Sequence, residues 1–344
     1  MFHEFPSSPD GADAEVFAQS FEQIDAAEQW ALDATWLAEL HFSPRSLLSA
    51  PVVIASAIAA RTKRMKIGTA VQILPLCHPV RLAEEVATLD HVSHGRLILG
   101  VGRSSFPRNY KGYGVPYAQS RERFTEVLEI LKLAWTQPTF SYHGAHHHFE
   151  DVFVVPKPRQ KPYPPIRVAA ASADTYATVG KLGYPLLISV RIESLTELGL
   201  LVRGYREAYK AAGHAGEGEV YLCVPIYIAR TDAQARDEPE ESIMHFVNYI
   251  GRHLEESADR AGARAIEQRT ERGRRLQTIT YDEVLRDRAV VGTPRSVIDR
   301  LEALREQLGL NGILAELNSG GLIPHGRVME SLRLLCHDVM PRFK

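Results

Sequence analysis

Apolar and polar residues follow one another along this chain in blocks that predict strands alternating with helices. Short apolar runs predict strands at residues 2–5, 35–41, 66–73, 96–101, 166–171, 185–190, 220–229 and 312–318. Apolar residues at helical spacing predict helices at residues 14–34, 48–61, 79–92, 117–135, 195–211 and 292–308, with a final helix to Met340. This alternation predicts a parallel (β/α)8 TIM barrel that forms one domain over residues 1–344.

Two segments interrupt the alternation. Residues 139–155 contain His143-Gly144 between two stretches with strand character, which predicts a hairpin inserted after the fourth strand. Residues 252–287, after the seventh strand, are highly charged and lack a clear apolar period. There we expect a mobile or partly disordered excursion.

Composition narrows the possible functions. The net charge of the 344 residues is −2, and no basic stripe is visible, which excludes a nucleic-acid partner. The first six residues lack the pattern of a signal peptide, and the longest apolar stretch, residues 50–60, is too short to span a bilayer. The three cysteines are far apart in the chain, which suits a reducing compartment. We expect a cytoplasmic protein without membrane contact.

Polar residues stand at the predicted strand ends, which converge on one face of a barrel. Because strand side chains alternate between two faces, Glu39 and His41 share the face opposite Trp36, Ala38 and Leu40. Two titratable side chains at the barrel mouth suit proton transfer or hydrogen bonding to a polar ring. The alternative is a buried pair that only holds the strand ends together.

A phosphate site is predicted from two further strand ends. Arg103 follows two glycines, and its guanidinium fork suits bidentate phosphate binding. Ser172 and Thr175 stand at the start of the next helix, where hydroxyls and free N–H groups can hold an anion. Together they predict a mononucleotide phosphate site, whereas Ser172 alone could be a helix cap.

Two other motifs carry less weight. His143, His146, His147 and His148 suggest a metal, but they lack a helical i, i+4 pair or a cysteine partner, so we expect no metal site. The Gly-x-Gly at residues 100–102 suggests a dinucleotide fold. However, Phe106-Pro107 follows where a helix would be needed, which argues against that fold.

An ordered series of motifs resembles bacterial luciferase and its flavin-dependent relatives. The series comprises Glu39-Leu40-His41-Phe42, residues 67–71 through Leu74-Pro75 and His78-Pro79, Gly95-Arg96, Gly292-Thr293-Pro294 and Asp338-Val339-Met340-Pro341. The resemblance implies a barrel that binds reduced FMN supplied by a separate flavin reductase. It also implies reaction of the flavin with O2 to a C4a-hydroperoxide that oxygenates a substrate.

The resemblance also assigns residues. Arg103, Ser172 and Thr175 match the residues that bind the FMN phosphate, and Ala70 and Val71 match a non-proline cis peptide against the flavin ring. Three departures stand out, because Leu40 replaces the catalytic histidine, Gly102 a reactive cysteine and Asn109 an aspartate. The departures make efficient light emission doubtful. We expect His41, oriented by Glu39, to handle the proton in place of the missing histidine.

The leading function is therefore a two-component monooxygenase for a small, mostly apolar substrate, contacted by Phe106, Asn109 and Tyr110. Two alternatives stay open: a coenzyme F420-dependent oxidoreductase on the same barrel, and a non-catalytic flavin-binding subunit. The resemblance further implies a homodimer or heterodimer through the helices at residues 48–61 and 79–92. The substrate cannot be deduced from the sequence.

Overall fold

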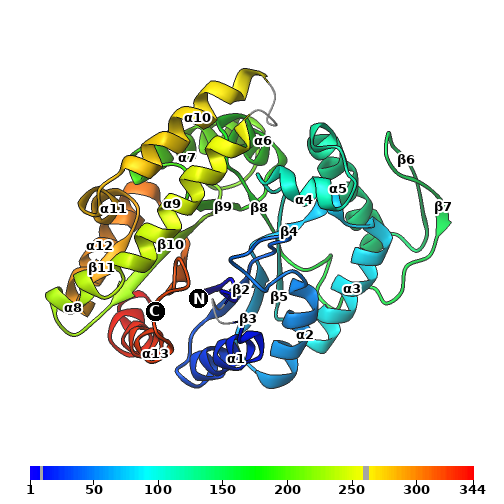
Figure 1. Cartoon of the computed structure of the whole chain (residues 1–344). Helices are drawn as coiled ribbons and strands as arrows, with labels where there is room; N and C mark the ends of the chain where they lie inside the picture. Colours follow the sequence, from blue (N-terminus) through cyan, green and yellow to red (C-terminus); the bar gives the residue numbers. More distant parts are fainter. Residues whose placement is uncertain (8–10, 259–262) are drawn as a thin grey trace. The chain divides into compact units, whose positions relative to one another are not determined.

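The structure, a computed structural model, describes residues 1–7, 11–258 and 263–344. These residues form two compact units. The first contains Met1–Leu32, Pro44–Leu47 and Ala170–Lys344, and the second contains Asp33–Ser43 and Leu48–Ala169. Figure 1 labels the helices and strands of both. The single domain expected over residues 1–344 stays a prediction.

The second unit is built on a parallel sheet. Its strands pair in the order β2 (Ala34–Leu37), β3 (Lys66–Thr69), β5 (Leu97–Gly102) and β8 (Ile166–Ala169), while β4 (Gln72–Ile73) pairs with the end of β5. The helices between them are α2 (Pro51–Arg61), α3 (Pro79–Val92) and α5 (Ser120–Thr136). Proline starts α2 and α3, since the first turn of a helix does not need its missing N–H.

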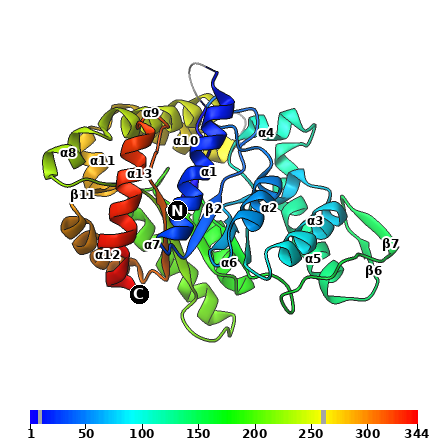
Figure 2. The same cartoon turned by 90° about the horizontal axis from the view of Figure 1, so that it is seen from below.

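The strands of the first unit are also parallel. Its strands pair in the order β9 (Leu186–Ser189), β10 (Val220–Ile228), β12 (Gly312–Glu316) and β1 (Phe2–His3), and β11 (Val290–Gly292) pairs with the last residues of β10. Its helices include α1 (Asp13–Gln29), α6 (Ala173–Leu182), α7 (Leu195–Ala211), α12 (Pro294–Leu308) and α13 (His325–Leu334). Helices α1 and α13 lie side by side (Figure 2).

The predicted fold is confirmed. In the part of the chain that the structure describes, β1, β2, β3, β5, β8, β9, β10 and β12 alternate in sequence with helices, and their pairings are parallel. This is the (β/α)8 barrel fold. The strands are nearly continuous apolar runs, as in β5, where every residue is buried. Parallel strands have such continuous apolar sequences because both faces of the sheet are covered by other parts of the protein. No described helix is long and apolar enough to cross a membrane.

The inserted hairpin lies where the sequence places it, between α5 and β8. Its strands β6 (Phe140–His143) and β7 (His148–Val152) pair antiparallel, with Tyr142 opposite Phe149. The hairpin extends outward beside α3 and α5 of the same unit (Figure 1).

The expectation for residues 252–287 is wrong in the residues that the structure describes, because this segment is helical. The chain forms α8 (Asp232–Asp237), α9 (Glu240–Glu256), α10 (Ala263–Thr278) and α11 (Tyr281–Asp287), while residues 259–262 lie outside the described part. Helices α9 and α10 cross at two glycines, where a Cβ on Gly273 would lie 2.7 Å from the Gly251 carbonyl oxygen. Helix α10, whose sequence lacks a clear apolar stripe, therefore packs on α9 through close contact between the two backbones.

Four further details differ from the prediction. The strand predicted at 35–41 ends at Leu37, and the strand predicted at 66–73 is split into β3 and β4. A short helix, α4 (Pro107–Gly112), starts where the sequence analysis expected none, because Pro107 occupies its first turn instead of preventing it. The short β11 was not predicted.

Candidate active site

Glu39 and His41 form a buried hydrogen-bonded pair just beyond β2. His41 Nε2 lies 2.7 Å from Glu39 Oε1, and the two residues are 6% and 8% exposed. The alternation argument thus correctly places both side chains together, although β2 ends before them. Leu40, between them, is also buried.

The Glu39 carboxylate also holds the neighbouring strand β4. Its Oε2 atom accepts hydrogen bonds from the side chain of Gln72 and the backbone N–H of Ile73, each at 2.7 Å. Burial raises the pKa of Glu39, and the hydrogen bonds from His41 and Ile73 partly oppose that rise. Sequence reasoning missed Gln72, although a lone polar residue in an apolar strand was a usable signal.

The peptide bond between Ala70 and Val71 is cis, as predicted. It lies between β3 and β4, so the Glu39 carboxylate binds the strand that directly follows it. Gly102 faces this turn, since a Cβ there would lie 2.6 Å from Val71 Cγ2. A cysteine at position 102 would therefore displace Val71.

Arg103 lies at the end of β5 in a partly buried position. Its Nη1 atom lies 3.4 Å from Ser120 Oγ, at the first residue of α5. Burial lowers the pKa of this guanidinium. The predicted partners Ser172 and Thr175 belong to the first unit, so their joint phosphate site with Arg103 stays a prediction.

Ser172 occupies the N-cap position of α6, but its hydroxyl makes no capping hydrogen bond to the helix backbone. Instead, Ser172 Oγ lies 2.8 Å from Thr175 Oγ1, and both residues are at the helix surface. The helix-cap alternative therefore fails for this serine side chain. Two adjacent hydroxyls at a helix N-terminus suit an anion.

The three predicted substrate residues differ in burial. Phe106 is half-buried and precedes α4, whereas Asn109 and Tyr110 are each 1% exposed. Asn109 Nδ2 donates to Ser104 Oγ at 3.2 Å, and the Tyr110 hydroxyl donates to the Arg103 carbonyl oxygen. These contacts order the loop after β5, and a substrate role for the three residues stays a prediction.

The histidine-rich hairpin is fixed to α5 by one carboxylate. Glu126 accepts hydrogen bonds from the backbone N–H groups of Ala145 and His146, and it lies 3.0 Å from His147 Nδ1. Burial alone would raise the pKa of Glu126, but these hydrogen bonds lower it. Among the described residues, no group of three or more His, Cys, Asp or Glu side chains could hold a metal ion.

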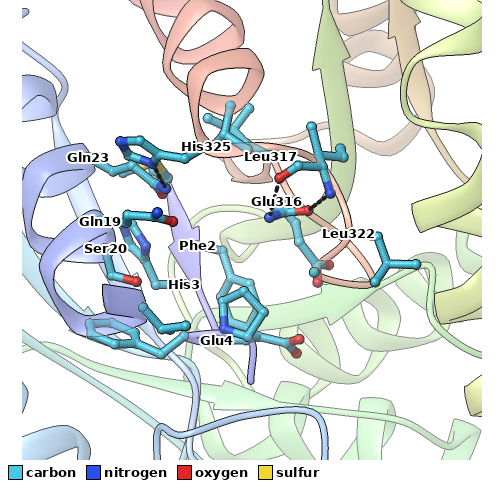
Figure 3. A pocket seen from close by; sticks show the side chains of 18 of the residues that line it. Phe2, His3, Glu4, Gln19, Ser20, Gln23, Glu316, Leu317, Leu322 and His325 are labelled. Atoms are coloured by element: carbon cyan, nitrogen blue, oxygen red, sulfur yellow. Dashed lines mark hydrogen bonds between the residues drawn. The ribbon is translucent and has the colours of Figure 1, made fainter. Parts of the chain in front are cut away.

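The first unit contains a pocket of about 340 Å³ between β1, α1 and the loop from β12 to α13 (Figure 3). Glu4 and Glu316 line it and both contact Arg191, at 2.7 and 3.2 Å. Arg45 also pairs with Glu4. Burial opposes ionisation of Glu4, but the two arginines lower its pKa to about 2. The sequence could not reveal this cluster, because Arg191 lies 187 positions from Glu4.

Comparisons with known proteins identify the family. The family model of luciferase-like monooxygenases matches residues 1–312. The chain belongs to this family. The chain matches an alkanal monooxygenase alpha chain from the Kryptophanaron alfredi symbiont with 26% identity over 342 residues, 96% of this chain and 94% of the relative. It also matches the oxygenase component of a flavin-dependent trigonelline monooxygenase from Acinetobacter baylyi, with 24% identity over 331 residues, 96% of this chain and 90% of the relative.

Two other relatives have a higher sequence identity but match a smaller part of the chain. The uncharacterized protein y4vJ of Sinorhizobium fredii is 35% identical over 204 residues, which are 59% of this luciferase-like monooxygenase and 57% of that protein. The y4wF protein of the same organism matches over 46% of its length. The chain thus spans about half the length of these two relatives.

Solved structures support the fold of the chain. The monooxygenase RslO1 from Streptomyces bottropensis has a TM-score of 0.78 and 25% identity, covering 100% of this chain and 99% of that one. The oxygenating constituent of 3,6-diketocamphane monooxygenase from Pseudomonas putida, in complex with FMN, has a TM-score of 0.80 and 19% identity, covering 99% and 97%. A coenzyme F420-dependent tetrahydromethanopterin reductase from Methanopyrus kandleri has a TM-score of 0.75 and 17% identity, covering 100% and 98%. The last two likenesses concern the fold alone.

Proposed function

We propose that this luciferase-like monooxygenase is the oxygenase of a two-component system. It takes up reduced FMN from a separate flavin reductase and uses O2 to oxygenate a small, mostly apolar organic substrate. A relative that is named as the oxygenase component of a flavin-dependent monooxygenase supports the two-component arrangement.

One observation carries the proposal. The Glu39–His41 pair is hydrogen-bonded to β4, which starts directly after the cis peptide at Ala70–Val71. A titratable pair is therefore built onto the turn that, by resemblance to the family, packs against a flavin ring.

The residues fit FMN. Arg103, Ser172 and Thr175 would hold the phosphate, since a guanidinium and two hydroxyls at a helix N-terminus are suited to a dianion. Val71, given room by Gly102, would pack against the isoalloxazine ring. Reduced FMN would supply the electrons that activate O2. His41 would hold or release a proton beside it, while Glu39 keeps the His41 ring oriented through Nε2.

The apolar side of the site suits a substrate with few polar groups. Phe42, next to His41, is 59% exposed, and its ring lies 5.7 Å from the ring of Tyr113. Gly112 permits this contact, because a Cβ there would lie 2.0 Å from Phe42 Cε2. The rings of Phe42 and Tyr113 offer an aromatic surface beside His41.

The test compares two cofactors under anaerobic conditions and then in oxygen. We expect the purified chain to quench the fluorescence of reduced FMN on binding and, with a flavin reductase and NADH, to consume O2. Reduced F420 is the control, with hydride transfer to an acceptor as its readout. Preference for F420 without oxygen consumption would refute the proposal, and flavin binding without turnover would indicate a non-catalytic subunit.

A further inference from the structure

The ring of His41 has hydrogen-bond partners at both of its nitrogens. Nε2 lies 2.7 Å from the Glu39 carboxylate, and Nδ1 lies 3.2 Å from the hydroxyl of Tyr113. Tyr113 follows the last residue of α4, and its ring meets the His41 ring edge-on, with centroids 4.9 Å apart. Glu39, His41 and Tyr113 thus form one hydrogen-bonded chain within the second unit.

The two ends of this chain differ in burial. Glu39 is 8% exposed and its second oxygen is occupied by Gln72 and Ile73, so it closes the inner end. Tyr113 is 48% exposed and opens the outer end. Because Nε2 faces the carboxylate, Nδ1 is the nitrogen left for proton exchange, and the group it contacts is the Tyr113 hydroxyl.

We propose that Tyr113 is the group through which His41 exchanges its proton during oxygenation, an inference that rests on the proposed function. When a proton leaves the chain, the O–H bond of Tyr113 breaks and its proton passes to water or to the reacting oxygen. In the same step the Nδ1–H bond of His41 breaks, and its proton forms the new Tyr113 O–H bond. The phenol stays neutral throughout, and the carboxylate balances the charge of the ring before the transfer.

The chemistry requires such a proton donor. Oxygenation transfers one atom of O2 to the substrate, and the other leaves as water, whose formation consumes protons at the site. Neither Leu40 nor Phe42, the sequence neighbours of His41, carries a proton donor. The Tyr113 hydroxyl extends the buried pair by one group toward solvent.

The variant Tyr113→Phe tests this inference, because it removes the hydroxyl and keeps the ring against His41 and Phe42. We expect the affinity for reduced FMN to stay within about twofold, and the fraction of O2 released as hydrogen peroxide to rise about fivefold or more. The matched control is Tyr142→Phe, which removes a hydroxyl that donates to Glu129 on the hairpin at 2.8 Å. The control should behave as the wild type.

A second measurement needs no flavin. In 15N NMR spectra, the Nδ1 resonance of His41 should move in Tyr113→Phe, as expected for an acceptor nitrogen that loses its donor, while the melting temperature stays unchanged. An unmoved Nδ1 resonance, or an unchanged peroxide fraction in an active enzyme, would overturn the role of Tyr113. If Nδ1 moves in Tyr113→Phe as expected but the wild type never consumes O2 with reduced FMN, the proposed function fails, and this role fails with it.

Discussion

Replacing Glu39 by alanine should destabilise the fold far more than replacing it by glutamine. The carboxylate accepts three hydrogen bonds at 2.7 Å, from His41, Gln72 and Ile73. In Glu39→Ala, the backbone N–H of Ile73 loses its acceptor in a buried site, while Gln72 keeps only a 3.4 Å contact to Cys77 Sγ. Each orphaned donor costs about 1–3 kcal/mol, and relief of the buried charge offsets part of it. We expect a loss of about 2–5 kcal/mol in the free energy of unfolding.

In Glu39→Gln, the amide oxygen can still accept from Gln72 and Ile73. The amide nitrogen then faces His41 Nε2 and donates to it, which moves the proton of the neutral ring to Nδ1. The free energy of unfolding should fall by about 1 kcal/mol or less. Proton transfer through His41 should nevertheless be impaired, because the direction of the hydrogen bond to Tyr113 is reversed.

Urea unfolding followed by circular dichroism measures these differences. The control is Glu85→Ala, which removes a carboxylate that pairs with exposed Arg81 at the protein surface, and it should behave as the wild type. Equal losses for Glu39→Ala and Glu39→Gln, or a loss below about 1 kcal/mol for alanine, would refute the hydrogen-bond accounting.

Three further predictions follow from other parts of the chain. Arg103→Ala should weaken the binding of reduced FMN by about 1.5–3 kcal/mol but leave the binding of riboflavin nearly unaffected. If a fluorescence titration shows equal losses of affinity for FMN and riboflavin, Arg103 does not bind the phosphate. The stabilising contribution of Glu126, whose pKa lies below 4.5, is present above pH 4.5 and is lost as the pH falls through its lowered pKa. The protection of the Ala145 and His146 amides against hydrogen exchange, relative to the intrinsic rate at each pH, should therefore fall in acid, and in Glu126→Ala it should already be low at neutral pH. Val53, 67% exposed on α2, should lie in a dimer interface, so that Val53→Asp converts a dimer to a monomer in light scattering, whereas a monomeric wild type would contradict the interface.

The sequence analysis correctly predicted helices and contacts that depend only on residues close together in the chain. Helix α3 agrees with its predicted bounds because Pro79 marks its start and its apolar stripe is regular. The Glu39–His41 pair could be predicted from the sequence, because the alternation of side chains holds over two neighbouring positions. The cis peptide at Ala70–Val71 came from family resemblance and not from any property of the two residues.

Other features depend on contacts between distant positions. Tyr113 and His41 are 72 positions apart in the sequence, and Arg191 and Glu4 are 187 positions apart. No local sequence pattern therefore indicates either contact. Helix α10 was missed because its packing uses Gly273 against Gly251 instead of an apolar stripe. Helix α4 was missed because Pro107 was taken as a helix breaker, although it occupies the first turn.

A crystal structure of the chain with FMN bound tests the central claim most directly. The account predicts the phosphate on Arg103, Ser172 and Thr175, the isoalloxazine ring against Val71, and the chain of Glu39, His41 and Tyr113 beside the ring. FMN bound elsewhere, for example in the pocket beside Glu4 and Glu316, or a ring far from Val71 and His41, would contradict it.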